Sequence, residues 1–307
     1  MTVLLRCLLL GMLAIVYAIP SPALAAQEPG APITITAAPG TLVRWTAPGI
    51  TRCGMQGRTW APLLETCYYP IDLLQKPAAI AISVVISGRR ELARISVGPF
   101  PYGTEEINLP DIPQANPSKE DLNRDRRDQT LESKAFARRE GPAKFTLPIG
   151  VPVRPLPEGK SFGAKRVFNG KPAMQPHTGS DYAAPAGSPV LAAADGTVLI
   201  AKDLFFAGNA VFIDHGNGLV TMYFHLARIE VQVGQEVTKG HTLGVVGSTG
   251  RSTGPHLFFG ARWHDARIDP MFLLEDPGKI PSVNDASAPA APAGANAKDS
   301  SKQTRKR

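Results

Sequence analysis

The chain has 307 residues, of which 43% are hydrophobic and 19% charged, and its formal net charge is +7. The apolar fraction is ordinary for a globular protein, so wholesale disorder is excluded, and the length suggests about two domains. With 29 Gly and 29 Pro the composition favours turn-rich β structure, and the positive charge suits an anionic partner such as cell wall, membrane surface or nucleic acid.

The first 25 residues have the pattern of an export signal. Arg6 precedes an apolar run over residues 8–19, which is followed by prolines and by Ala23-Leu24-Ala25. A charged start, a short apolar core and an A-x-A end are typical of a secretory signal peptide. We therefore expect residues 1–25 to be removed and the mature protein to be periplasmic or secreted, without a transmembrane span. The alternative interpretation is a buried N-terminal helix.

Residues 30–112 are predicted to form a small β-sandwich. Runs rich in β-branched residues, such as 33–36 and 80–85, are separated by Gly and Pro turns. Cys53 and Cys67 are the only cysteines left after cleavage of the signal peptide. In an exported protein such a pair is most simply a disulfide, and the absence of a nearby His disfavours a metal site.

Residues 113–144 and 277–307 differ in character from the segments that they flank. Ser118-Lys119-Glu120-Asp121 resembles the start of a helix with a capping carboxylate, and residues 124–128 then mix both signs of charge. This favours a charged, solvated helical linker over a nucleic-acid patch. Residues 277–307 are dominated by small and polar residues towards their end, so we expect a disordered tail.

Residues 145–276 are predicted to form an antiparallel all-β domain, which makes the whole protein all-β. Strand-like runs at 190–194 and 197–201 flank Asp195-Gly196, and those at 210–214 and 219–225 flank a turn with two glycines. All six histidines lie in this stretch. His215 and His241 fall at predicted turns, where we expect solvated side chains, and His264 falls at a predicted hairpin turn beyond the last strand.

The other three histidines occur in motifs that carry a resemblance. The motifs are His177-Thr178-Gly179-Ser180-Asp181, Tyr223-Phe224-His225-Leu226 and Gly254-Pro255-His256-Leu257. In this order and context they resemble the LytM, or lysostaphin-type, zinc metalloendopeptidases, which cut the peptide cross-links of peptidoglycan. The resemblance implies zinc as the cofactor and peptidoglycan as the partner.

The resemblance also implies roles for individual residues. His177 and Asp181 match two zinc ligands, while His225 and His256 match the non-ligand active-site histidines that transfer protons and stabilise the tetrahedral intermediate. The family's third ligand is the second His of an H-x-H strand, and here that position is Phe258. A phenyl ring donates no lone pair, and a catalytic zinc needs three protein ligands and an open position. Zinc should therefore be bound weakly or not at all.

Two functional hypotheses follow. The first is an exported cell-wall endopeptidase with an altered site, in which His225 or His256 rotates to become the third ligand. The second is a non-catalytic module that binds peptidoglycan or regulates another cell-wall hydrolase. A comparison with biotinyl or lipoyl carriers finds no carrier motif around Lys239, and no nucleic-acid motif is present.

Overall fold

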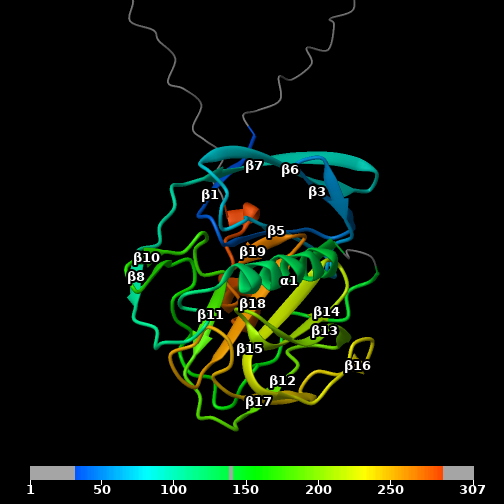
Figure 1. Cartoon of the computed structure of the whole chain (residues 1–307). Coiled ribbons are helices and arrows are strands. Elements are labelled where there is room, and N and C mark those ends of the chain that lie inside the picture. Colours follow the sequence, from blue (N-terminus) through cyan, green and yellow to red (C-terminus); the bar gives the residue numbers. More distant parts are fainter. Residues whose placement is uncertain (1–31, 138–140, 286–307) are drawn as a thin grey trace, which may run out of the picture. The chain divides into compact units, whose positions relative to one another are not determined.

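The computed structural model describes residues 32–137 and 141–285 (Figure 1). The predicted signal peptide, residues 1–25, lies outside the described residues, as does most of the predicted tail. No helix in the described ranges is both long and apolar enough to cross a membrane. The described chain is mostly β-sheet, as the composition indicated.

The N-terminal part contains a five-stranded sheet in the order β1-β7-β6-β3-β4 and a separate pair, β2-β5. Its strands are β1 (Thr34–Ala37), β2 (Leu42–Thr46), β3 (Ile50–Met55), β4 (Arg58–Trp60), β5 (Thr66–Pro70), β6 (Ala78–Ile86) and β7 (Arg89–Val97). Alternate residues of β6 and β7, including Ile82 and Ile95, are buried between the two layers. The predicted Cys53–Cys67 disulfide is present and joins β3 to β5.

The C-terminal part is built on a nine-stranded sheet whose main order is β11-β18-β15-β14-β13-β16. All its pairs are antiparallel, as predicted. Its strands are β11 (Gly179–Tyr182), β12 (Pro189–Leu191), β13 (Gly196–Leu204), β14 (Gly208–Asp214), β15 (Leu219–Ile229), β16 (Glu236–Val237), β17 (Thr242–Val246), β18 (Leu257–Trp263) and β19 (Ala266–Ile268).

The period-2 alternation of these strands gives the sheet two apolar faces. One face, with Tyr223, Phe259 and Trp263, joins the main core. That core also takes in Leu42 and Tyr68 from the N-terminal part, and Tyr68 stacks on Trp263 with ring centroids 5.3 Å apart. The β2–β5 pair of the N-terminal part is therefore packed against the larger sheet through ordinary core contacts.

The opposite face of the sheet carries helix α1 (Lys119–Ala137), which was expected to be solvated. The helix is charged, but Ala135 and Phe136 are buried against Phe212 in a cluster that also contains Phe258. Figure 1 shows α1 lying across β13, β14 and β18. The prediction of a helix is confirmed, and the prediction that it is solvated is wrong on one face, because Leu131, Ala135 and Phe136 pack against the sheet.

A small three-stranded sheet connects the segments on either side of α1. It contains β8 (Thr104–Ile107), β9 (Lys165–Phe168) and β10 (Lys171–Pro172), with β8 parallel to β9. The pairing of β8 with β9 brings Glu105 beside Arg166. This register matters for the site described below.

The predicted disordered tail is wrong for residues 277–285. After α2 (Met271–Leu274), two short 3-10 turns, Pro277–Lys279 and Val283–Asp285, return the chain to the N-terminal part. Ile280 and Val283 are buried, and the guanidinium of Arg44 donates to the Ile280 carbonyl at 2.9 Å. Two apolar anchors in a polar stretch were enough to order it.

His215 was expected to be solvated, but it is completely buried. Its Nδ1 lies 2.7 Å from the carbonyl of Asp195 and its Nε2 lies 2.7 Å from Oγ1 of Thr221. Since a carbonyl can only accept, Nδ1 carries the hydrogen and Nε2 accepts from the hydroxyl. Burial lowers the pKa of His215 to about 4.

This pKa predicts an acid-sensitive fold. Between about pH 6.5 and pH 4 the unfolded chain binds a proton at His215 that the folded chain does not, so stability falls as pH falls, by up to about 3 kcal/mol. Urea unfolding at a series of pH values measures this. The variant His215→Gln should show a shallower loss over the same interval, whereas His241→Gln, at an exposed position, should follow the wild type. An equal slope in all three proteins would contradict the assignment.

Candidate functional site

The candidate site forms where the edge strand β11 pairs with β18. The register places Asp181 opposite Phe258, and the sheet also pairs Phe258 with Phe224 on β15. His177 lies just before β11, and its ring is close to Asp181 on the same face of the sheet. The three sequence motifs are therefore brought together by neighbouring strands, as the resemblance implied.

His225 reaches this face through an unusual backbone conformation. Its φ is +65°, and the register of β15 with β14 shifts across it, with a second shift against β17 just after it. In a regular strand Phe224 and His225 would point to opposite faces. Here Phe224 stacks on Phe258 while the His225 ring lies 4.7 Å from that of His256, so both side chains contact residues of the site. A left-handed non-glycine residue is costly and is often found at functional sites.

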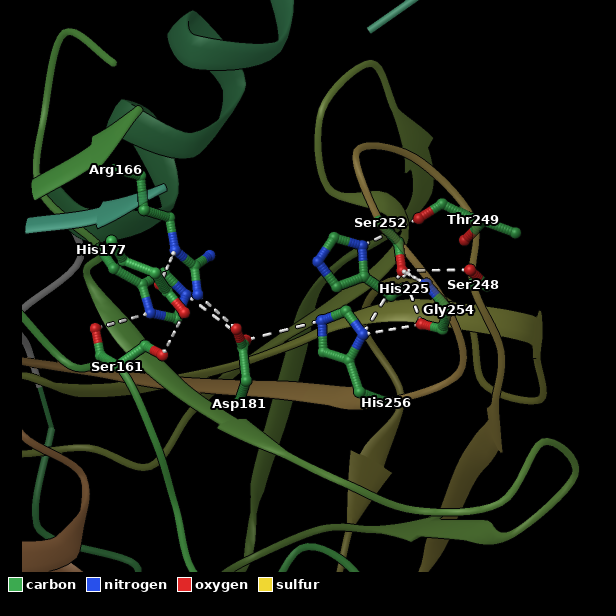
Figure 2. A network of polar contacts seen from close by, with 11 residues as sticks. Ser161, Arg166, His177, Asp181, His225, Ser248, Thr249, Ser252, Gly254 and His256 are labelled. Carbon is green, nitrogen blue, oxygen red and sulfur yellow. Dashed lines mark hydrogen bonds and ion pairs between the residues drawn. The ribbon is translucent and has the colours of Figure 1, made fainter. Parts of the chain in front are cut away.

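The carboxylate of Asp181 lies at the centre of the polar cluster (Figure 2). Its Oδ2 accepts from Nη2 of Arg166 at 2.5 Å. Its Oδ1 lies 3.4 Å from Nε2 of His177 and 3.6 Å from Nε2 of His256. Three basic side chains thus surround one acid.

Each histidine of the cluster is held by a backbone carbonyl at Nδ1. The carbonyls belong to Ser161 for His177 (3.0 Å), to Thr249 for His225 (2.8 Å) and to Gly254 for His256 (2.9 Å). A carbonyl accepts, so Nδ1 carries the hydrogen, and in the neutral ring Nε2 carries the lone pair. All three histidines are therefore held in the tautomer that leaves Nε2 available for a ligand or a proton.

The electrostatics favour an ionised Asp181 and a neutral His225. Burial alone would raise the pKa of Asp181, but the adjacent His177, with the charges of Arg166 and His256, holds that pKa well below its usual range. Burial, aided by the positive charge of His256, lowers the pKa of His225 to about 3. At neutral pH the cluster therefore contains a fixed carboxylate and a base that resists protonation.

Phe258 fills the space beside the His177 ring. It is 4% exposed, stacks on Phe224 with centroids 4.4 Å apart and planes 4° apart, and meets His177 edge-on at 5.1 Å. Gly179 accommodates it, because a Cβ there would lie 2.5 Å from the Phe258 ring. The phenyl ring is thus well packed, and it closes this side of the site with an apolar surface.

Two donor atoms of the cluster suit a metal ion. Nε2 of His177 and Oδ1 of Asp181 are both buried without a hydrogen-bond partner. Their 3.4 Å separation equals the roughly 3.4 Å expected between two ligands of a tetrahedral zinc. However, no group of three or more His, Cys, Asp or Glu side chains in the described ranges is placed to hold a metal. The residues fit two ligand positions and do not make a complete three-ligand zinc site.

Arg166 was missed by the sequence analysis. It reaches Asp181 from β9, and its Nε donates to Glu105 of β8 at 3.0 Å. Arg251 was also not singled out from the sequence, and its guanidinium lies between the rings of Phe168 and Phe206, at 4.2 and 4.4 Å. The pairing of β8 with β9, which assembles this side of the site, has no local signal in the sequence.

Comparisons with known proteins agree with the motifs. The model of peptidase family M23 matches residues 175–270. The peptidoglycan DD-endopeptidase ShyA of Vibrio cholerae is 42% identical over 99 residues, which are 32% of this chain and 23% of ShyA. The DD-carboxypeptidase/endopeptidase Mpg of Neisseria meningitidis is 48% identical over 95 residues, 31% of this chain and 22% of Mpg. The matched stretch thus spans less than a quarter of either curated relative.

A solved structure matches over a longer range. A Pseudomonas aeruginosa protein assigned to peptidase M23 is 30% identical, with a TM-score of 0.60, and the match covers 77% of this chain and 94% of that one. The similarity therefore extends beyond the segment that carries the motifs, into the N-terminal part.

The Arg166–Asp181 pair should be energetically coupled. Both side chains are mostly buried, and removing one partner leaves a buried charge that is less well compensated, so Arg166→Gln should cost about 3 kcal/mol of unfolding free energy at neutral pH. The double variant with Asp181→Asn should lose less than the sum of the two single losses, as measured by urea unfolding. Arg228→Gln, which breaks the exposed pair with Glu230, is the control and should cost under about 1 kcal/mol. Strict additivity would contradict the coupling.

Proposed function

Because this chain belongs to peptidase family M23, whose peptidases are zinc metalloproteases, we propose that it is an exported, peptidoglycan-directed protein that binds wall peptides without cleaving them. In this proposal Phe258 stands in the position of the third zinc ligand. The family fold and the polar frame of the site are kept, while the metal chemistry is lost. Peptidoglycan is the partner named for ShyA among its relatives.

The packing of Phe258 carries this proposal. A missing ligand could be replaced by water or by a neighbouring side chain if the position were open. Instead the ring is 4% exposed and is held between His177 and Phe224. A catalytic zinc requires three protein ligands and an open position for water, and the phenyl ring removes a donor and the room for a substitute together.

The remaining polar groups support binding. The lone pair at Nε2 of His225 and the Oδ1 of Asp181, which has no hydrogen-bond partner, are acceptors for the N–H groups of a peptide. Arg166 fixes the Asp181 carboxylate, and the three backbone carbonyls fix the imidazole rings. A row of pre-oriented acceptors on a rigid sheet is suited to holding an extended peptide.

Export rests on two features that support each other. Residues 1–25 have the order of a signal peptide. The Cys53–Cys67 disulfide suits an oxidising compartment such as the periplasm or the exterior of the cell. We infer that the protein acts where peptidoglycan is found.

A second candidate is a weakly active endopeptidase. It is favoured by the position of His256, whose Nε2 lies 3.6 Å from Oδ1 of Asp181, close to the separation expected between two zinc ligands. If His256 completed the metal site, it would no longer be available to move protons. Zinc content and peptide release distinguish this candidate from the first.

Zinc content tests the proposal directly. The wild type should hold far less than one zinc per chain after dialysis against trace zinc, measured by elemental analysis. Phe258→His should raise zinc affinity by more than about 100-fold, since loss of even an outer-shell partner of a metal site costs about 10–100-fold. Phe258→Leu, which changes the packing without adding a lone pair, is the matched control and should stay zinc-poor. One tightly held zinc in the wild type would favour the second candidate.

Binding and cleavage should separate in the wild type. The purified protein should sediment with peptidoglycan sacculi while releasing no soluble fragments detectable by chromatography. Phe258→His, loaded with zinc, should release fragments if the other groups remain competent. Wild-type release of fragments that stops on chelation of zinc would contradict the proposal.

A further inference from the structure

The outer face of the N-terminal sheet carries three exposed arginines and no acid. The strand register assigns its outward positions, because residues paired across strands share a face. Arg90 and Arg52 both flank Val85, and Arg94 pairs with Ala81. The inward positions of the same strands, such as Ile82 and Ile95, are buried in the core.

Apart from Val85 and Leu92, the rest of this face is small or polar. The other outward positions of the five strands are Thr34, Thr36, Gly54, Thr59, Ala79, Ala81, Ser83, Val85, Leu92 and Ser96. None of them is Asp or Glu. Leu92 stands between the arginines and is 58% exposed, so the face presents one apolar contact within a field of positive charge.

The three arginines differ from five others in the described chain by lacking carboxylate partners. Arg124, Arg166, Arg228, Arg262 and Arg267 each lie within 4.0 Å of an Asp or Glu oxygen. Within residues 32–137 and 141–285, no ion pair joins Arg52, Arg90 or Arg94 to an acid. Their positive charges are therefore available to an external, negatively charged partner.

The spacing of the arginines suits an extended polyanion. Arg90 and Arg52 are separated by one strand, which places their backbones about 10 Å apart, and Arg94 lies four residues along β7 from Arg90, about 13 Å away. A flat sheet face with cations at such intervals can contact several negative groups of one chain. A compact anion could engage only one or two of them.

We propose that this arginine face, defined by Arg52, Arg90 and Arg94, binds the carboxylates of peptidoglycan stem peptides. The choice of polymer rests on the proposed function, while the positive face itself is independent of the M23 site. The protein then holds the wall at two places: peptide N–H groups at the site around Asp181, and peptide carboxylates at the N-terminal sheet.

The test compares two triple variants of the full mature chain that remove the same charge. Arg52→Gln/Arg90→Gln/Arg94→Gln neutralises the face. Lys119→Gln/Arg127→Gln/Lys134→Gln neutralises three exposed positions on α1 and is the control. Dissociation constants are measured by co-sedimentation with purified peptidoglycan sacculi, and separately with phosphatidylglycerol vesicles, at low salt and at about 0.15 M salt, where the Debye length is about 8 Å.

The face variant should bind sacculi about tenfold more weakly than the wild type at low salt, with a smaller difference at the higher salt, because exposed charge pairs contribute little individually and are screened. The control variant should lose less than about threefold. Equal losses in both variants would mean a non-specific charge effect and would overturn the inference. So would a loss confined to the vesicles, which would assign the face to a membrane surface.

The outcomes also separate this inference from the proposed function. If wild type and face variant bind sacculi equally, the arginine face is not the contact, while the proposed function stands. If the wild type does not bind sacculi at all, both proposals fail.

Discussion

The buried carboxylate of Asp181 is the constraint around which the candidate site is arranged. A charge in that position is tolerated only when it is paired and hydrogen-bonded. Arg166 takes one oxygen, and His177 and His256 approach the other without a hydrogen bond to it. The result is a carboxylate that is ionised and oriented, with one buried oxygen that has no hydrogen-bond partner. Both proposed uses of the site, peptide binding and metal binding, need that free oxygen.

The pairing of Asp181 with Arg166 also explains why segments distant in sequence must meet. Arg166 lies on β9, which is parallel to β8, and Glu105 of β8 holds the other edge of the guanidinium. The segment between β8 and β9 contains α1, whose Phe136 packs on the same sheet face as Phe258. The helix and the small sheet are therefore part of the support of the site, and the linker expected from composition is a structural component.

Much of this arrangement could be predicted from the sequence, for identifiable reasons. The glycine turns and β-branched runs have local causes, so the antiparallel strands were predictable, and so was the meeting of His177, Asp181, His225 and His256 once their motifs were recognised. His215 was misjudged because its flanking glycines suggested a turn, whereas its burial depends on Asp195 and Thr221. Arg166 was missed because a parallel pairing between distant strands has no local signature. Two apolar residues, Ile280 and Val283, were too few to predict an ordered structure in an otherwise polar segment, yet both are buried in the core.

The aromatic ring at Phe258 is also the more stable solution when no metal is bound. Burying a phenyl ring contributes about 1.5–3 kcal/mol, and a stacked partner such as Phe224 adds about 0.5–1.5 kcal/mol. An imidazole in the same apolar surroundings would leave a buried nitrogen without a partner, at a cost of about 1–3 kcal/mol. That cost is recovered only if a metal ion occupies the site. In a protein that keeps the peptide-binding residues but binds no zinc, a phenyl ring at position 258 therefore stabilises the fold by several kcal/mol relative to an imidazole. The charge of Asp181 remains neutralised by Arg166.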